Sequence, residues 1–290
     1  MKKSIFENKL VADMLYITTE YAKFYDSAGG ARKADYAQKL TEHYADMSTF
    51  DTRYLNTPTP PTAMVKYLQG MKDGKYKFSP QEGTLKDALT KPDAMDYFHF
   101  QNYDHARGQA PEASRRIVVG LWSQSDALPL ADAMLELFKD PDIGPRMASF
   151  KVFLSFNPST TRTDPVQMKG DKAVIYYSAD LDDLDTDRVG STIARAVDAA
   201  VPANRRDARL APFYEEIAQG IAWADETGKA SFTQVRDDLI TRVVRANPNV
   251  TDQRAFYDLV LAQMRQDNVD PSATHRYFAD VETPPAPKLG

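Results

Sequence analysis

The stretch that decides the fold is Phe150-Lys151-Val152-Phe153-Leu154-Ser155-Phe156. Successive side chains of a β-strand point to opposite faces, so Lys151 would lie on the face opposite Val152. A second strand-like run over residues 172–178 follows a proline-containing loop, and the two runs predict the arms of a long hairpin. A lysine on a sheet face is either a solvated residue or a group with a chemical role. The function therefore depends on what surrounds Lys151.

The segments on either side of this hairpin complete a familiar order. The run Ile117-Val118-Val119-Gly120-Leu121-Trp122 is apolar and β-branched, as in a well-covered strand, and residues 126–139 carry apolar side chains at helical spacing. Residues 187–200 repeat that spacing, and further extended segments are expected between residues 210 and 223. Strand, helix, strand, strand, helix, strand is the split βαβ order. We therefore expect an α+β fold with a mixed β-sheet and a split βαβ-like core.

The amino-terminal part is predicted to be helical. Apolar residues recur every three or four positions over residues 4–25, which indicates one buried stripe on a helix. The prolines within residues 57–62 interrupt this pattern because proline removes a backbone donor, and a helix is expected to restart with Met64 and run to about Met71. Residues 83–111 show no clear pattern.

Helical patterns return after the last extended segments. Ser231 is a candidate cap for a helix that ends at Pro248, and Thr251 or Asp252 is a candidate cap for the next one. The last residues are rich in proline and are expected to be disordered. The predicted division is a helical amino-terminal region over 1–110, an α+β core over 111–282 and a disordered tail over 283–290.

Composition excludes several classes of function. The chain has 290 residues and a formal net charge of −5, which argues against general electrostatic binding of nucleic acid. It contains no cysteine, and its four histidines lack metal-site spacing, so no metal site is expected. No apolar run is long enough to span a membrane. Charged residues soon after Met1-Lys2-Lys3 interrupt the apolar core that a signal peptide requires.

A series of short segments between about residues 50 and 280 carries a resemblance. They are Arg53-Tyr54-Leu55, Met64-Val65-Lys66-Tyr67-Leu68, Arg116-Ile117-Val118-Val119, Phe150-Lys151-Val152, Lys169-Gly170-Asp171-Lys172-Ala173-Val174-Ile175-Tyr176, Gly220-Ile221-Ala222-Trp223-Ala224-Asp225, Ser231-Phe232-Thr233-Gln234-Val235-Arg236 and Asn268-Val269-Asp270-Pro271. In this order they resemble the HopA-like family. That family is named after a bacterial type III effector and includes lyase components of lanthipeptide and thioamitide biosynthesis.

The resemblance implies a lyase that eliminates phosphate from phosphoserine or phosphothreonine in a peptide, without metal or cofactor. Such a reaction needs a base for the α-proton and cations that hold the departing phosphate. Lys151 is the candidate base. The other site candidates are Tyr177 and His275 for catalysis and Arg162, Lys169, Lys172 and Arg236 for phosphate binding.

The implied partners are a phosphorylated precursor or host peptide and a kinase that prepares it. The implied location is the cytoplasm, or secretion as an effector without a cleavable signal peptide. The chain departs from the family pattern at two positions, and the departure at Val235 favours a second hypothesis, a non-catalytic protein that binds a (phospho)peptide or host partner. Lys169 stands where the family has an arginine, and Val235 stands where the pattern suggests a histidine.

Each candidate also has a purely structural interpretation. Lys151 could alternate outward into solvent, and Lys169-Gly170-Asp171 could be an ordinary turn. Arg236 could pair with neighbouring aspartates on a helix surface. The acidic run over residues 180–187 lacks the glycine and glutamate of an EF-hand loop, so we interpret it as a helix start instead of a calcium site.

Overall fold

The computed structural model describes residues 54, 59–91, 95–103, 113–156, 171–179, 186–210, 213–226, 232–250, 252–278 and 285–289. The predicted helix over residues 4–25 lies outside these ranges, as do Arg162, Lys169 and the helix cap Ser231. None of the helices in the described ranges is long and apolar enough to cross a membrane.

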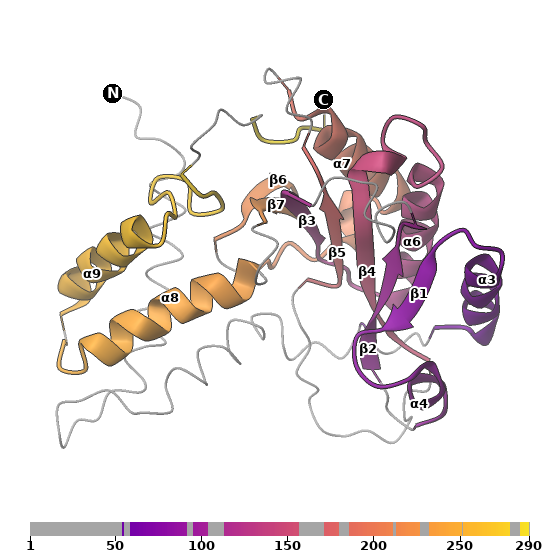
Figure 1. The fold of residues 1–290 in the computed structure, drawn as a ribbon, viewed down its shortest axis with the longest axis horizontal. Helices are drawn as coiled ribbons and strands as arrows, with labels where there is room; N and C mark the ends of the chain where they lie inside the picture. Colours follow the sequence, from indigo (N-terminus) through magenta and orange to yellow (C-terminus); the bar gives the residue numbers. More distant parts are fainter. Residues whose placement is uncertain are drawn as a thin grey trace.

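One seven-stranded sheet forms the centre of the molecule (Figure 1). Its strand order is β1-β2-β4-β5-β3-β7-β6. The strands are β1 (Lys77–Pro80), β2 (Met95–Gln101), β3 (Arg115–Val119), β4 (Met147–Ser155), β5 (Ala173–Tyr177), β6 (Glu215–Ala218) and β7 (Ile221–Asp225).

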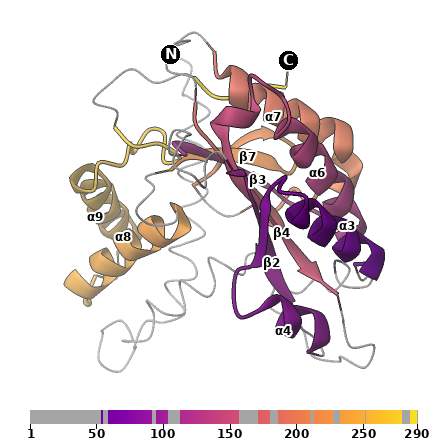
Figure 2. The same ribbon diagram turned by 45° about the vertical axis from the view of Figure 1, so that its right-hand side comes forward.

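Helices cover both faces of this sheet. Figure 2 shows α3, α6 and α7 on one side and α8 and α9 on the other. We call these sides the α6 face and the α8 face. The helices are α3 (Pro61–Lys72), α4 (Leu85–Thr90), α6 (Gln124–Leu137), α7 (Arg188–Ala200), α8 (Phe232–Ala246) and α9 (Gln253–Gln266). The side chain of Asp252 caps α9 by accepting a hydrogen bond from the backbone N–H of Ala255, as the sequence predicts.

The expected α+β class and split βαβ order are confirmed. The unit β3-α6-β4 has β5 between its two strands, and the unit β5-α7-β7 has β3 between its two strands. Every neighbouring pair among the described strands is antiparallel, whereas the sequence predicts a mixed sheet. The reason is that each split unit places an antiparallel strand between two strands that run parallel to each other.

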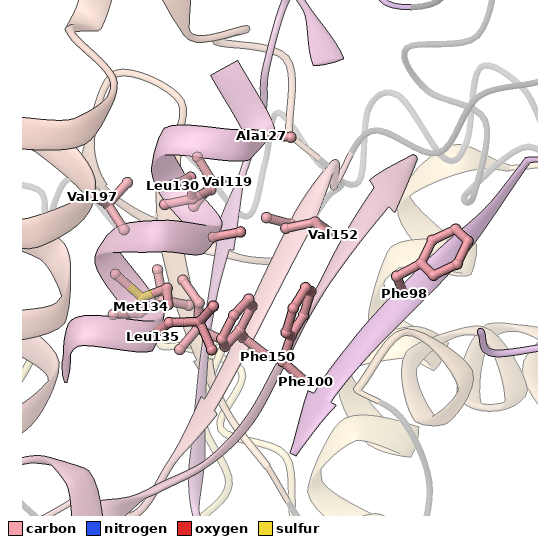
Figure 3. Packing of buried hydrophobic residues seen from close by; sticks show 14 of the residues in the cluster. Phe98, Phe100, Val119, Ala127, Leu130, Met134, Leu135, Phe150, Val152 and Val197 are labelled. Atoms are coloured by element: carbon pink, nitrogen blue, oxygen red, sulfur yellow. The ribbon is translucent and has the colours of Figure 1, made fainter. Parts of the chain in front are cut away.

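The larger core lies on the α6 face and fixes the orientation of β2 and β4 (Figure 3). Phe100 of β2 stacks on Phe150 of β4 with ring centroids 4.6 Å apart, while Leu130 and Met134 of α6 pack on the same face. A second core on the α8 face joins side chains of the central strands to α8 and α9. Because strand side chains alternate, filling the α6 face with the phenylalanines sends Lys151 to the α8 face.

The amino-terminal region differs from the helical expectation for residues 1–110. The helix predicted from Met64 to Met71 is present within α3, but β1 and β2 are strands of the central sheet. Proline at the end of β1 and the shortness of that strand weaken its sequence signal, since proline is tolerated mainly at strand ends and edges.

The carboxyl-terminal tail also differs from expectation. The sequence predicts disorder over residues 283–290, whereas residues 285–289 are placed against the core and α7. The backbone oxygen of Pro285 accepts a hydrogen bond from Arg115, and the backbone N–H of Lys288 donates to Ser191 Oγ. Ala286 and Leu289 pack against the α6-face core, so these contacts offset the loss of chain entropy on ordering.

Candidate functional site

Lys151 lies on β4 directly opposite His99 of β2 in the strand register. Gln81, the first residue after β1, touches both side chains. Its Oε1 accepts a hydrogen bond from Lys151 Nζ at 3.2 Å and lies 3.4 Å from His99 Nε2. The Nζ of Lys151 also lies 4.2 Å from the ring centroid of Tyr97. We call these four side chains the Lys151 cluster.

The strand β2 positions two members of this cluster. Phe98 and Phe100 point into the α6-face core, so Tyr97 and His99 point to the α8 face. The Tyr97 hydroxyl lies close to the backbone oxygen of Asp171 and 3.1 Å from its Oδ1. Burial, followed by the Asp171 charge, raises the pKa of Tyr97 well above its ordinary value. Tyr97 is therefore a neutral, anchored ring over which the lysine lies.

The cluster is electrostatically unusual because a cation and a histidine share a partly buried surface. Burial and then the charge of Lys151 lower the pKa of His99 to about 4. His99 is consequently a neutral imidazole near pH 7 in the structure as it stands. An anion bound between Lys151 and His99 would oppose the effect of the Lys151 charge and raise the pKa of His99, since an opposite charge favours the protonated imidazole.

Lys172 is the second predicted cation that the structure brings to this region. It falls two residues before Val174 of β5, which pairs with Lys151, so alternation places it on the same face. Its backbone oxygen accepts from Phe153 N–H at 2.8 Å, and its Nζ lies 5.5 Å from the ring centroid of Tyr54. Lys172 is almost fully buried. The Lys151 cluster and Lys172 thus come from β2, β4, the residue after β1 and the residue before β5.

Arg236 lies elsewhere on the α8 face, in the second core. Its guanidinium is sandwiched between the rings of Phe232 and Tyr277, with centroid distances of 4.5 and 4.6 Å, and donates twice to the backbone oxygen of Thr274. These contacts tie α8 to the segment that follows α9. Val235, the residue before it, is partly buried on α8.

Tyr177 lies on the α6 face, on the side of the sheet away from Lys151. It is fully buried, and its hydroxyl donates to Asp187 Oδ2 at 2.6 Å. Arg115 donates to the same oxygen at 2.8 Å and also lies 3.4 Å from Asp225 Oδ1. Burial, followed by the charge of Asp187, raises the pKa of Tyr177 well above its ordinary value, so this phenol is a neutral donor in a buried ion-pair network.

His275 is also remote from Lys151. It forms an ion-pair contact of 2.6 Å with Glu215 of β6 and packs edge-on against Trp223 of β7. The strands β4 and β6 are separated by four strand spacings in the sheet order, or about 19 Å at ~4.8 Å each. Among the described candidates, then, the structure groups Lys151 with Lys172 and separates both from Tyr177, His275 and Arg236.

The sequence analysis does not select Gln81 or Tyr97 of this cluster, nor does it select His99. A signal for it exists, because Tyr97-Phe98-His99-Phe100 alternates polar and apolar side chains as a half-buried strand does. What the sequence lacks is the register that places position 99 opposite position 151. In the described ranges, no group of three or more histidine, aspartate or glutamate side chains is arranged to hold a metal ion.

Comparisons with known proteins give structural similarity at low sequence identity. No protein-family model and no curated protein matches the sequence. An effector protein from Pseudomonas syringae pv. tomato strain DC3000 is similar with a TM-score of 0.60 and 14% identity, over 93% of this chain and 99% of that one. An effector protein from Pseudomonas syringae pv. syringae strain 61 gives a TM-score of 0.59 and 15% identity, over 92% and 98% of the two chains. The chain therefore shares its fold with these bacterial effector proteins.

Proposed function

We propose that this chain is a HopA-like effector that eliminates phosphate from phosphoserine or phosphothreonine in a peptide. The observation that carries the proposal is the pairing of Lys151 with His99 on the α8 face, where an amine and an imidazole lie side by side. A β-elimination needs one group that accepts a proton and another that donates one, within reach of the same substrate. The effector identity of the two similar structures supports the effector part of the proposal.

In this scheme the neutral amine of Lys151 removes the α-proton of the phosphorylated residue. The electron pair of the Cα–H bond forms the Cα=Cβ double bond, and the Cβ–O bond breaks. His99 donates its proton to the departing phosphate oxygen. The products are a dehydroamino acid and inorganic phosphate. Before the next turnover, Lys151, now an ammonium, returns its proton to solvent and His99 takes up a proton again.

The charge of the substrate would prepare His99 for its role, whereas the same charge favours the ammonium form of Lys151, which must lose a proton before it can act as the base. A phosphate dianion beside His99 counteracts the Lys151 charge and raises the pKa of the imidazole from about 4, so that it can carry the proton that leaves with phosphate. Lys172, on the neighbouring strand, is the described cation placed to contribute to phosphate binding. As a point charge it provides attraction without the bidentate geometry of arginine.

One contact favours the second candidate function, binding of a phosphorylated peptide without conversion. The ring of Tyr97 lies 4.2 Å from Lys151 Nζ, and a cation–π contact stabilises the ammonium form of lysine, which cannot act as a base. Lys151 and Lys172 would then act only as phosphate-binding charges. The two functions differ in their product and are therefore separable by mass.

The deciding experiment incubates the purified chain with a phosphoserine and a phosphothreonine peptide library and follows mass. The lyase proposal predicts a loss of about 98 Da per site, abolished by Lys151→Ala and slowed roughly 100-fold or more by His99→Gln. Lys139→Ala is the matched control, because Lys139 is an exposed lysine whose described ion pair is with the neighbouring Glu136. Its turnover should equal that of the wild type.

Peptide binding by the wild type without any mass change would support the second candidate and overturn the lyase proposal. Full turnover by Lys151→Ala would remove this residue from the role of base. Absence of both turnover and phosphopeptide binding would exclude both functions for these peptides.

A further inference from the structure

A cavity of about 240 Å³ lies between the start of α7 and the carboxyl-terminal residues 285–289. Two hydrogen bonds hold the tail beside the helix, one from Arg115 to the backbone oxygen of Pro285 at 2.8 Å and one from the backbone N–H of Lys288 to Ser191 Oγ at 3.0 Å. The cavity is thus built jointly by two segments, in which the hydrogen-bonded Ser191 and Lys288 are 97 residues apart in the sequence.

Three cationic side chains line this cavity: Arg188 and Arg195 of α7 and Lys288 of the tail. Arg195 donates to Thr192 Oγ1 one turn earlier. In the part of the chain that the structure describes, neither Arg195 nor Lys288 has a carboxylate within ion-pair distance.

The carboxylate that also lines the cavity, Asp187, is already bound on both oxygens. Its Oδ1 accepts from the backbone N–H of Gly190, and its Oδ2 accepts from Arg115 and from the Tyr177 hydroxyl. The buried Arg115 guanidinium balances its charge. Asp187 therefore adds little repulsion toward an anion in the cavity. Arg188 lies 3.9 Å from Asp142 Oδ2, so Arg195 and Lys288 contribute most of the positive potential there.

We infer that this cavity is a binding site for an oxyanion group, with inorganic phosphate as its simplest ligand. The volume is several times the ~30 Å³ that a water molecule occupies in the liquid, so a phosphate group has room together with solvent. Arg188 and Arg195 can supply forked donors, and Lys288 supplies a point charge. The site is independent of the Lys151 cluster, because α7 covers the opposite face of the sheet.

Binding at this site would couple the ligand to the position of the tail. Lys288 belongs to the tail and Arg195 to the helix, so an oxyanion that contacts both adds a third attachment between these segments. A ligand that binds only the docked arrangement stabilises it by mass action. Phosphate should therefore protect the carboxyl-terminal residues from removal by a carboxypeptidase.

The test is isothermal titration calorimetry of the full chain with sodium phosphate, with chloride adjusted to keep the ionic strength fixed. We expect phosphate to bind at this site, with affinity reduced about tenfold by Arg195→Ala and by Lys288→Ala, since each removes one charge-assisted contact. Both side chains are exposed, so the fold should be preserved, which circular dichroism checks. Arg254→Ala on α9 is the matched control, because it removes an exposed arginine from a distant helix.

Carboxypeptidase digestion provides the second measurement. Phosphate should slow removal of the tail in the wild type and in Arg254→Ala, and should have no effect in the double variant Arg195→Ala/Lys288→Ala. Failure of phosphate to bind, or equal binding by the double variant and the wild type, would overturn the inference. If Lys151→Ala loses lyase turnover but still binds phosphate at the cavity beside α7, this cavity and the Lys151 cluster are separate sites.

Discussion

Replacing Arg115 by methionine should destabilise the fold by about 3–5 kcal/mol, which is the range for removing one partner of a buried ion pair. Arg115 is 2% exposed, and its partner Asp187 is completely buried. After the change, Asp187 would keep only the Tyr177 hydroxyl and the Gly190 N–H as donors. A buried carboxylate without a cation is costly because its desolvation is no longer offset.

The assay is urea denaturation followed by the fluorescence of Trp223, whose ring centroid lies 4.5 Å from the Arg115 guanidinium, in a Trp122→Phe background. The expected midpoint shift is about 1–2.5 M urea for an m-value of about 2–3 kcal/mol/M. The double variant Arg115→Met/Asp187→Asn removes both charges and should return to within about 2 kcal/mol of the parent.

Lys66→Met is the control for this comparison. It breaks an exposed ion pair with Asp132 and should cost less than about 1 kcal/mol. Two results would refute the claim that the unpaired charge of Asp187 destabilises Arg115→Met. One is a loss of unfolding free energy below about 1 kcal/mol for Arg115→Met. The other is an Arg115→Met/Asp187→Asn variant that is no more stable than Arg115→Met.

Two further predictions concern His99 and Gly190. The pKa of His99 is lowered from 6.5 to about 4 in the folded state, so between these pH values the folded protein binds fewer protons than the unfolded chain. The free energy of unfolding should therefore fall as the pH decreases from 6.5 to 4. In thermal melts, His99→Gln should weaken this pH dependence. By NMR titration, Lys151→Met should raise the pKa of His99 only in part, because burial is the larger cause. Gly190→Ala should destabilise the protein by about 1–3 kcal/mol in urea denaturation. The reason is that a Cβ there would lie 2.3 Å from the Tyr177 hydroxyl and 2.5 Å from Asp187 Oδ2. An unchanged urea midpoint would contradict this packing.

Much of the fold follows from local patterns in the sequence. The strand predicted at residues 150–156 is part of β4, the strand predicted at 172–178 contains β5, and the helices predicted at 126–139 and 187–200 correspond to α6 and α7. The two helices have strong periodicity because one face of each packs on the sheet, and the two strands are short apolar runs because most of their side chains are buried on both faces of the sheet. The strand β1 has only four residues, too few for a period to be recognised.

The site is less predictable because it depends on register between distant segments. Lys151 pairs with Val174, so Tyr177, three residues further along β5, falls on the opposite face of the sheet. A register shifted by one residue would have placed the two side chains on the same face. No local pattern determines that register across the long loop between β4 and β5.

The two edges of the sheet limit how a peptide could be recognised. At one edge, β1 has four residues and ends in Pro80, which has no N–H to donate. At the other, β6 has four residues with Glu215 and Glu216 among them, and its pairing with β7 shifts register between Glu216 and Ala218. Neither edge offers the long, regular row of backbone groups that an added strand requires. If this chain binds a peptide, as proposed above, the peptide is recognised by side chains across a face of the sheet, and its specificity should reside in the charge and shape of a few residues instead of in an extended backbone.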